Sequence, residues 1–156
     1  MATDTSPGAV EVARRRGVRD ARVLAFEDVD ARLGNFDTVV MYGNNFGLFG
    51  GEARARQLLR RLHPLAVRIV ASTMNPHETS DPIHLAYHTR NRSRGRMAGQ
   101  LRLRVRYREV ASPWFDYLLA SPEELQTLVD GTGWLVHRII EGKPVYVAVL
   151  ERSPQT

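Results

Sequence analysis

The sequence predicts an α/β fold with a parallel sheet that ends in an antiparallel hairpin. Residues 36–42 and 67–72 are apolar runs of strand type, and residues 52–63 between them show helical periodicity. Such strand–helix–strand alternation favours neighbouring parallel strands. The last two segments of strand type, 133–141 and 144–151, are separated only by a short loop, which is typical of a hairpin.

Three local signals place the first helix, a strand and a later helix. Ser6 can accept hydrogen bonds from the first free amides of a helix, and Pro7 is tolerated in its first turn. This helix is expected to end at Gly17. Residues 21–26 form a short apolar run that predicts a strand. The same reasoning places a helix at Ser121, which is followed by a proline and two glutamates.

The central elements are predicted from their apolar patterns. Residues 36–42 are apolar at successive positions, as expected for a parallel strand that is covered on both faces, and residues 67–72 follow the same pattern. The helix between them presents one apolar side. That side consists of Ala55, Leu58, Leu59 and Leu62.

After residue 75 the pattern changes. Residues 76–82 are expected to form a loop and residues 83–94 a helix. From 100 to 110 the residues alternate, which predicts a half-exposed antiparallel strand with 114–119 as its partner. The two alternating rows are Leu101, Leu103, Val105 and Tyr107 on one face and Arg102, Arg104, Arg106 and Arg108 on the other.

Length and composition narrow the class of protein. The chain has 156 residues, of which 43% are hydrophobic and 25% charged, and we expect a single globular domain over residues 1–156. It contains no cysteine, which excludes a disulfide framework and thiolate metal sites. No apolar run is long enough to span a bilayer or to serve as a signal peptide, which predicts a cytoplasmic protein without a membrane partner.

The net charge of +5 originates in one segment. Residues 90–108 contain eight arginines and no acidic residue. A row of guanidinium groups on one strand face could bind phosphates. The alternative is a solvated strand face, which amphipathic alternation predicts by itself. Few aromatic residues accompany the arginines, and Tyr107 falls on the opposite face, so the sequence does not favour nucleic acid as a partner.

Two further patterns concern possible sites. His84 and His88 have the i, i+4 spacing of metal ligands, but a third ligand is not evident, so no metal is predicted. Tyr87 and His88 are instead candidates for a general base. The glycines after residue 42 do not have the spacing of a dinucleotide-binding loop. Either they serve tight turn geometry alone, or Asn44 and Asn45 face a ligand there.

Four segments, taken in order, carry a resemblance to a known family. They are Asp4-Thr5-Ser6-Pro7 with the helix after it, Glu27-Asp28-Val29, the strand 36–42, and the turn Tyr42-Gly43-Asn44-Asn45. The later helices and the final hairpin follow in the expected order. This set resembles the class I S-adenosylmethionine-dependent methyltransferases from their second strand onward.

The resemblance implies a Rossmann-like sheet with strand order 3-2-1-4-5-7-6 and methyl transfer from S-adenosylmethionine to a small-molecule acceptor. It implies cofactor contacts at Asp4, Asp28, Val29, Tyr42, Gly43 and Asn44. Residues 75–119 would form a β-containing cap over the substrate. Acceptor contacts are expected at Asn45, Phe46 and Trp114, and catalytic roles at Tyr87 and His88.

Two departures from the family pattern limit this expectation. The glycine-rich first motif has no counterpart because the chain begins after it, and residues 62–68 lack the usual Pro-Gly-Gly turn. We therefore expect a sheet truncated at the N-terminus, weak cofactor binding by this chain alone, and completion by a homodimer or by the missing N-terminal half. Strands 4-5-7-6 should be intact. The alternatives are a non-catalytic remnant that acts as an interaction module and, less favoured, an arginine-rich nucleic-acid-binding protein.

Overall fold

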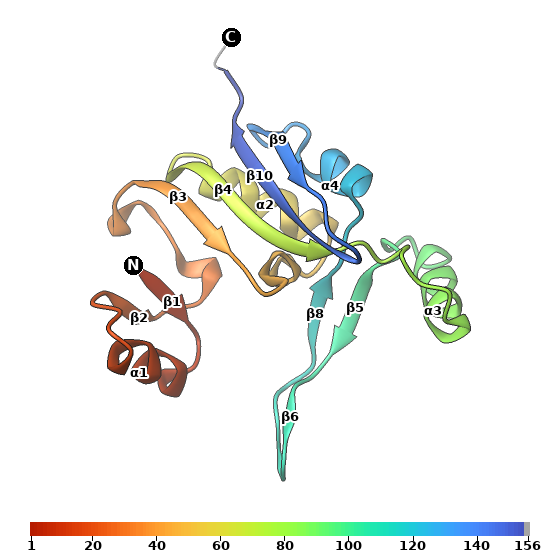
Figure 1. Ribbon diagram of the computed structural model, residues 1–156, viewed down its shortest axis with the longest axis horizontal. Coiled ribbons are helices and arrows are strands. Elements are labelled where there is room, and N and C mark those ends of the chain that lie inside the picture. The colour runs from red at the N-terminus through yellow and green to blue at the C-terminus, as the bar shows by residue number, and fades with distance from the viewer. Residues whose placement is uncertain (155–156) are drawn as a thin grey trace. The chain divides into compact units, whose positions relative to one another are not determined.

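The computed structural model describes residues 1–154, which form two compact units, residues 1–35 and residues 36–154 (Figure 1). The sequence predicts a single domain over residues 1–156. Each unit has its own sheet and is described by itself below. Within the described residues, no helix is both long and apolar enough to cross a bilayer.

The first unit is a small strand–helix–strand motif. Strand β1 (Ala2–Asp4) pairs in parallel with β2 (Ala21–Val23), and helix α1 (Pro7–Arg15) connects them. The predicted cap is confirmed, because the Ser6 side chain accepts a hydrogen bond from the Ala9 amide. The strand expected over 21–26 is shorter, since two 3-10 turns, η1 (Phe26–Asp28) and η2 (Ala31–Leu33), follow it. Strand β1 was not predicted from the sequence.

The second unit is built on a four-stranded sheet with the order β3-β4-β10-β9. Strands β3 (Phe36–Met41) and β4 (Ala66–Met74) are parallel, and β10 (Val145–Arg152) runs antiparallel to both β4 and β9 (Trp134–Ile140). This order confirms the 4-5-7-6 arrangement expected from the sequence, with the final strand antiparallel.

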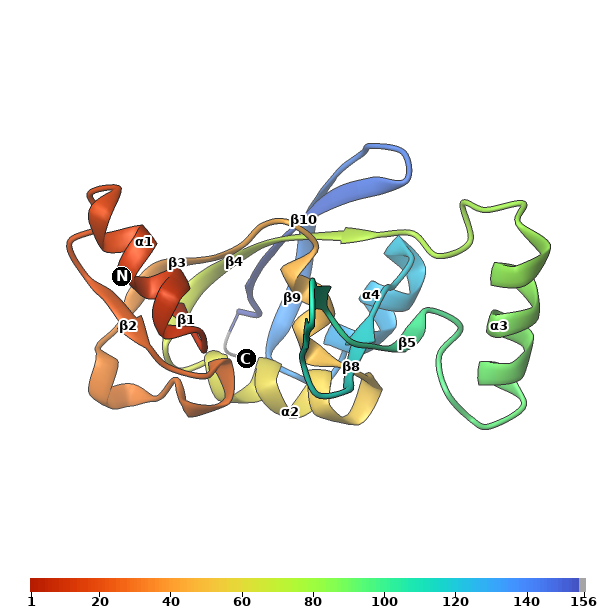
Figure 2. The ribbon, with the colours of Figure 1, turned by 90° about the horizontal axis from the view of Figure 1, so that it is seen from below.

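Two helices cover one face of this sheet (Figure 2). Helix α2 (Glu52–Leu62) buries the predicted apolar side, and helix α4 (Pro122–Val129) begins with a capping box in which Ser121 and Glu124 satisfy each other's amides. The indole Nε1 of Trp134 donates to the Leu59 carbonyl at 2.8 Å, which fixes α2 against β9. The core of the unit therefore lies between the sheet and these helices.

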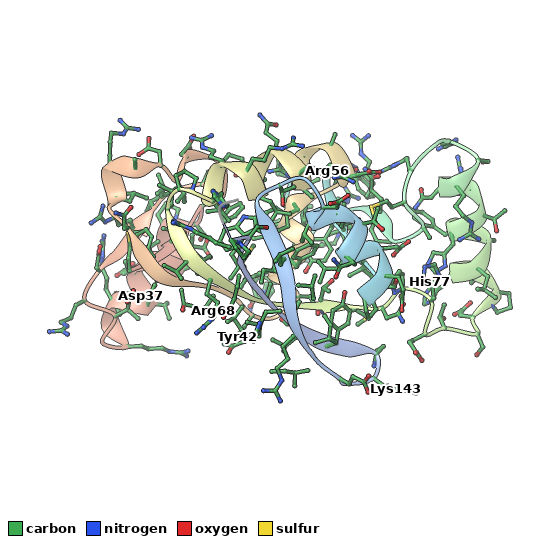
Figure 3. All side chains as sticks on the ribbon, turned by 90° about the horizontal axis from the view of Figure 1, so that it is seen from above. Asp37, Tyr42, Arg56, Arg68, His77 and Lys143 are labelled. Carbon is green, nitrogen blue, oxygen red and sulfur yellow. The ribbon has the colours of Figure 1, made fainter. Side chains whose placement is uncertain are left out.

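The opposite face of the sheet is more open. Val40 is 54% exposed, and Arg68 pairs with Glu151 across β4 and β10 at 2.6 Å (Figure 3). The prediction that residues 36–42 and 67–72 are covered on both faces is therefore wrong at Val40, Tyr42 and Val67, which are all more than half exposed. An apolar run cannot by itself distinguish a strand with two covered faces from one with a single covered face.

Between β4 and α4 the chain forms helix α3 (Pro82–Arg92) and an extended hairpin, residues 100–118, which we call the arm (Figure 1). Strand β5 (Gln100–Leu103) pairs with β8 (Phe115–Leu118), and farther out β6 (Arg106–Tyr107) pairs with β7 (Val110–Ala111). The pairing of 114–119 with 100–103 is confirmed.

The single strand predicted over 100–110 is wrong at its far end. The chain reverses at Arg108, whose φ of 51° is left-handed, so Val110 lies on the returning strand. Across this two-residue turn the alternation changes parity, because Val110 pairs with Tyr107 and shares its face. Glu109 and Val110 break the alternation of residues 101–108, and that break marks the reversal in the sequence.

Candidate functional site

The best-defined polar site lies where β3 and β4 end. Ligands of α/β proteins bind beyond the carboxyl ends of parallel strands, and these two strands are the parallel pair of the second unit. Residues 42–45, which we call the Asn44 turn, follow β3 directly, and Ser72 lies near the end of β4. The predicted cofactor and acceptor residues Tyr42 and Asn45 are both exposed on this turn.

Asn44 is the centre of the turn and is held from two sides. Its backbone is left-handed, with φ at 62°. Its amide donates to the Ser72 Oγ at 3.0 Å, and its carbonyl accepts from the Tyr117 hydroxyl and from the Gly47 amide, the latter at 2.8 Å. The Asn44 Oδ1 is buried without a hydrogen-bond partner. A residue with both features persists only because its surroundings enforce it.

The other predicted residues of this segment differ in accessibility. Gly43 has φ at 66°, a conformation that favours glycine, and its backbone is exposed. Phe46 is only 1% exposed, and its ring packs edge-on against Phe49 at a centroid distance of 4.8 Å. The expected acceptor contact at Phe46 therefore falls on a core side chain. The 3-10 turn η3 (Asn45–Phe49) directs that side chain inward.

Tyr87 and His88 lie on α3, within a separate cluster of histidines. His88 is 6% exposed, and its ring centroid lies 5.9 Å from that of His77. The His77 Nε2 in turn approaches the Glu124 Oε1 at 3.4 Å. Burial is the main cause that lowers the pKa of His88, and the nearby His77 and Arg92 charges act in the same direction.

This cluster is apart from the Asn44 turn. Tyr42 and His77 lie well separated in Figure 3, and the Tyr87 hydroxyl accepts a hydrogen bond from the Arg102 amide of the arm. The fold therefore brings Tyr42, Gly43, Asn44 and Asn45 together without bringing Tyr87 or His88 to them. Within residues 1–154, no three or more His, Cys, Asp or Glu side chains gather in a way that could hold a metal ion.

Trp114, the third expected acceptor contact, lies on the arm and is 56% exposed. The guanidinium of Arg104 lies over its ring at 5.0 Å from the centroid. On the outer part of the arm, Arg108 lies in the same way over Tyr107, at 5.2 Å. These contacts leave both aromatic rings exposed on one side.

The three predicted cofactor residues of the first unit have different environments. Asp4 ends β1 and is exposed, although its Oδ1 already accepts a hydrogen bond from the Ser6 amide at 2.7 Å. Asp28 lies exposed in η1, whereas Val29 is 8% exposed and belongs to the core of that unit.

Sequence reasoning did not identify Ser72 and Tyr117 as site residues. Ser72 directly follows the apolar run from Ile69 to Ala71 in β4, and a polar residue near a strand end is a usable signal. Tyr117 gave no comparable signal, because its alternation within the arm indicates only which face it occupies. Burial raises the pKa of Tyr117, so its hydroxyl remains a hydrogen-bond donor through the neutral range.

Comparison with solved structures identifies the fold. The chain is similar to a SAM-dependent methyltransferase from Bacteroides fragilis in complex with S-adenosyl-L-homocysteine, with 25% identity and a TM-score of 0.76 over 97% of this chain. It is also similar to the CcbJ methyltransferase from Streptomyces caelestis, with 12% identity and a TM-score of 0.67 over 97% of this chain and 73% of that one. The sequence matches no protein-family model and no curated protein sequence.

A third similar structure is a Burkholderia thailandensis 1,6-didemethyltoxoflavin-N1-methyltransferase with bound 1,6-didemethyltoxoflavin and S-adenosylhomocysteine, at 16% identity and a TM-score of 0.57. This chain spans 97% of its own length in that match and 60% of the Burkholderia chain, and it spans 62% of the Bacteroides chain. The fold is therefore that of the SAM-dependent methyltransferases, and S-adenosylmethionine is the cofactor of this fold.

Proposed function

We propose that this chain forms the substrate-side part of an S-adenosylmethionine-dependent methyltransferase that acts on a small-molecule acceptor. One observation carries the proposal. The Asn44 turn is held in a left-handed conformation at the carboxyl ends of two parallel strands, in a fold that methyltransferases share. Strained turns that neighbouring groups enforce are concentrated at ligand sites.

The atoms that the turn presents fit a polar ligand. Tyr42 and Asn45 are exposed, and the backbone at Gly43 can approach a ligand closely because it has no side chain. S-adenosylmethionine supplies a methyl group on a positively charged sulfur. What the protein must add is alignment of the acceptor atom with that methyl group, which a rigid turn can provide without an acid or a base.

Tyr87 and His88 remain proposed catalytic residues for an acceptor that must lose a proton. The lowered pKa of His88 keeps its imidazole neutral at neutral pH, which is the form that accepts a proton. Because His88 lies in the separate histidine cluster, this role requires an acceptor that reaches α3. Residues 75–119, which include α3 and the arm, are the proposed cap.

Binding of S-adenosylhomocysteine, followed by NMR on the purified chain, tests the proposal. We expect weak, saturable shifts of the Tyr42–Asn45 amides, with a dissociation constant of about 0.1–1 mM, or about −5.5 to −4 kcal/mol. Asn44→Ala should weaken this binding by about 3- to 10-fold, because alanine disfavours the left-handed backbone.

Asn35→Ala is the matched control, since Asn35 is exposed and lies outside the turn. It should leave the affinity unchanged. Shifts that spread over the chain without saturating, or equal losses in both variants, would contradict the proposal. Tight binding in the low micromolar range would instead show that this chain supplies more of the cofactor site than we propose.

A second candidate function is an interaction module that completes its sheet with another strand, and we propose a second copy of this chain as the source. The Phe36 amide donates to the Leu65 carbonyl at 2.8 Å, so in a parallel ladder residues 36, 38 and 40 bond to β4. The amides of Asp37 and Val39 therefore point to the other edge. No described strand pairs with that edge.

Val39→Pro tests this second candidate, because proline removes an outward amide without removing a bond to β4. Sedimentation over a range of concentrations should show that the unaltered chain self-associates and that Val39→Pro does not, with unchanged circular dichroism. Thr38→Pro is the contrasting variant, since it removes a bond to β4 and should impair folding. A chain that stays monomeric at its highest soluble concentration would refute a second copy as the occupant.

A further inference from the structure

The hydroxyl of Tyr117 connects two parts of the second unit that are distant in sequence. Tyr117 lies on β8, at the base of the arm, and its hydroxyl donates to the carbonyl of Asn44, 73 residues earlier. The same carbonyl accepts from the Gly47 amide, so both of its lone pairs are used. Together with the bond from the Asn44 amide to Ser72, this fixes the peptide groups on both sides of Asn44.

The ring of Tyr117 packs directly on the backbone of Gly47. A Cβ atom at Gly47 would lie 2.2 Å from the Cζ of Tyr117, closer than any side chain could be accommodated without displacing the ring. Gly47 is buried and lies in the middle of the 3-10 turn η3, which follows Asn44. Glycine at this position is therefore required by the close approach of the aromatic ring.

We propose that Tyr117 is a positioning residue: through its hydroxyl, the arm holds the Asn44 turn in its ligand-facing conformation. The effect of Tyr117 on ligand binding rests on the proposed function, whereas its role in holding the turn does not. Asn44 has an unfavourable backbone conformation and an unpaired buried oxygen, so the turn would relax without outside support. Tyr117 and Ser72 are the two groups that supply that support from other elements.

The link has a consequence for binding. Any ligand that holds the base of the arm also stabilises the turn, and a ligand on the turn stabilises the base of the arm, because the coupling of two sites is reciprocal. An acceptor bound against the proposed cap would thus strengthen binding at the Asn44 turn without touching it. Tyr117 is the contact through which that coupling passes.

Tyr117→Phe is the direct test, because it removes the hydroxyl and keeps the ring against Gly47. Hydrogen exchange followed by NMR should show about 3- to 10-fold faster exchange at the amides of Asn45 and Gly47, both of which are hydrogen-bonded within the turn. The dissociation constant of S-adenosylhomocysteine should rise by a similar factor. Gly47→Ala should have a larger effect of the same kind because it displaces the ring.

Tyr146→Phe is the matched control. Its hydroxyl also donates to a backbone carbonyl, that of Ala120 at 2.8 Å, but it lies away from the turn and is more deeply buried. This variant should lower the global stability at least as much and leave exchange at Asn45 and Gly47 unchanged. Unchanged exchange in Tyr117→Phe, or equal acceleration in both variants, would overturn the positioning role. If neither the unaltered chain nor any variant binds S-adenosylhomocysteine, the proposed function fails. The exchange data would still decide whether Tyr117 holds the Asn44 turn.

Discussion

The four-stranded sheet and the arm belong to the same unit and show the same alternation of side chains, yet they differ in what covers them. In β10, Tyr146, Ala148 and Leu150 alternate with less buried residues and are 3% exposed or less. On the outer arm, Val105 and Tyr107 alternate with arginines in the same way and are 62% and 69% exposed. The two regions therefore share a sequence pattern and not an environment.

This difference separates two kinds of information in a strand. An alternating pattern with a period of two indicates which residues share a face of the strand. Burial depends on whether another element packs on that face, and here α2 and α4 pack on the sheet while no described element packs on the end of the arm (Figures 1 and 2). A two-stranded hairpin without such packing gains little stability of its own. We therefore expect the sheet to determine the stability of the unit.

The largest effect is expected when the two tryptophans, one in the sheet and one in the arm, are each replaced. Trp134→Ala in β9 should lower the free energy of unfolding by about 3–5 kcal/mol, because it empties a fully packed site and leaves the Leu59 carbonyl with the His63 amide as its remaining donor. Trp114→Ala in the arm should cost about 1 kcal/mol or less, since it loses mainly an exposed contact with Arg104. Urea unfolding followed by circular dichroism measures both.

Equal losses in the two variants would contradict the comparison, because they would show that the arm is packed as tightly as the sheet. The slope of the urea transition serves as a control. It should be unchanged if each variant alters stability without altering the surface that unfolding exposes.

The fold was more predictable than the site because its signals are local and repeated. The apolar side of α2 and the cap of α4 each depend on a few neighbouring residues, and both are confirmed. Strand β1 was missed because three exposed residues show no period. The turn at Arg108 was missed because a non-glycine residue adopts a left-handed backbone there.

The site depends on contacts across the chain, which a single sequence does not reveal. The predicted turn after β3 is found where expected, but its two supports, Ser72 and Tyr117, lie 28 and 73 residues from Asn44. Phe46 was expected to face a ligand, and a 3-10 turn places it in the core instead. The chemical type of a side chain suggested which residues could bind a ligand. Which of these residues a ligand can reach depends on how the chain packs.

The smallest effect is expected from the arginines of the arm. Arg102, Arg104 and Arg106 are exposed, and no described carboxylate pairs with any of them, so replacing all three with glutamine should change the stability by about 0.5 kcal/mol or less. Removing three like charges from one face can even raise stability at low salt, where repulsion is least screened. Binding of S-adenosylhomocysteine should not change, because these side chains lie outside the Asn44 turn. Thermal unfolding at low and high salt measures this change in stability.

Fluorescence anisotropy with a labelled single-stranded RNA tests whether the arginine face binds nucleic acid. Binding that weakens steeply with salt and disappears in the triple variant would overturn the view that this face is only solvated.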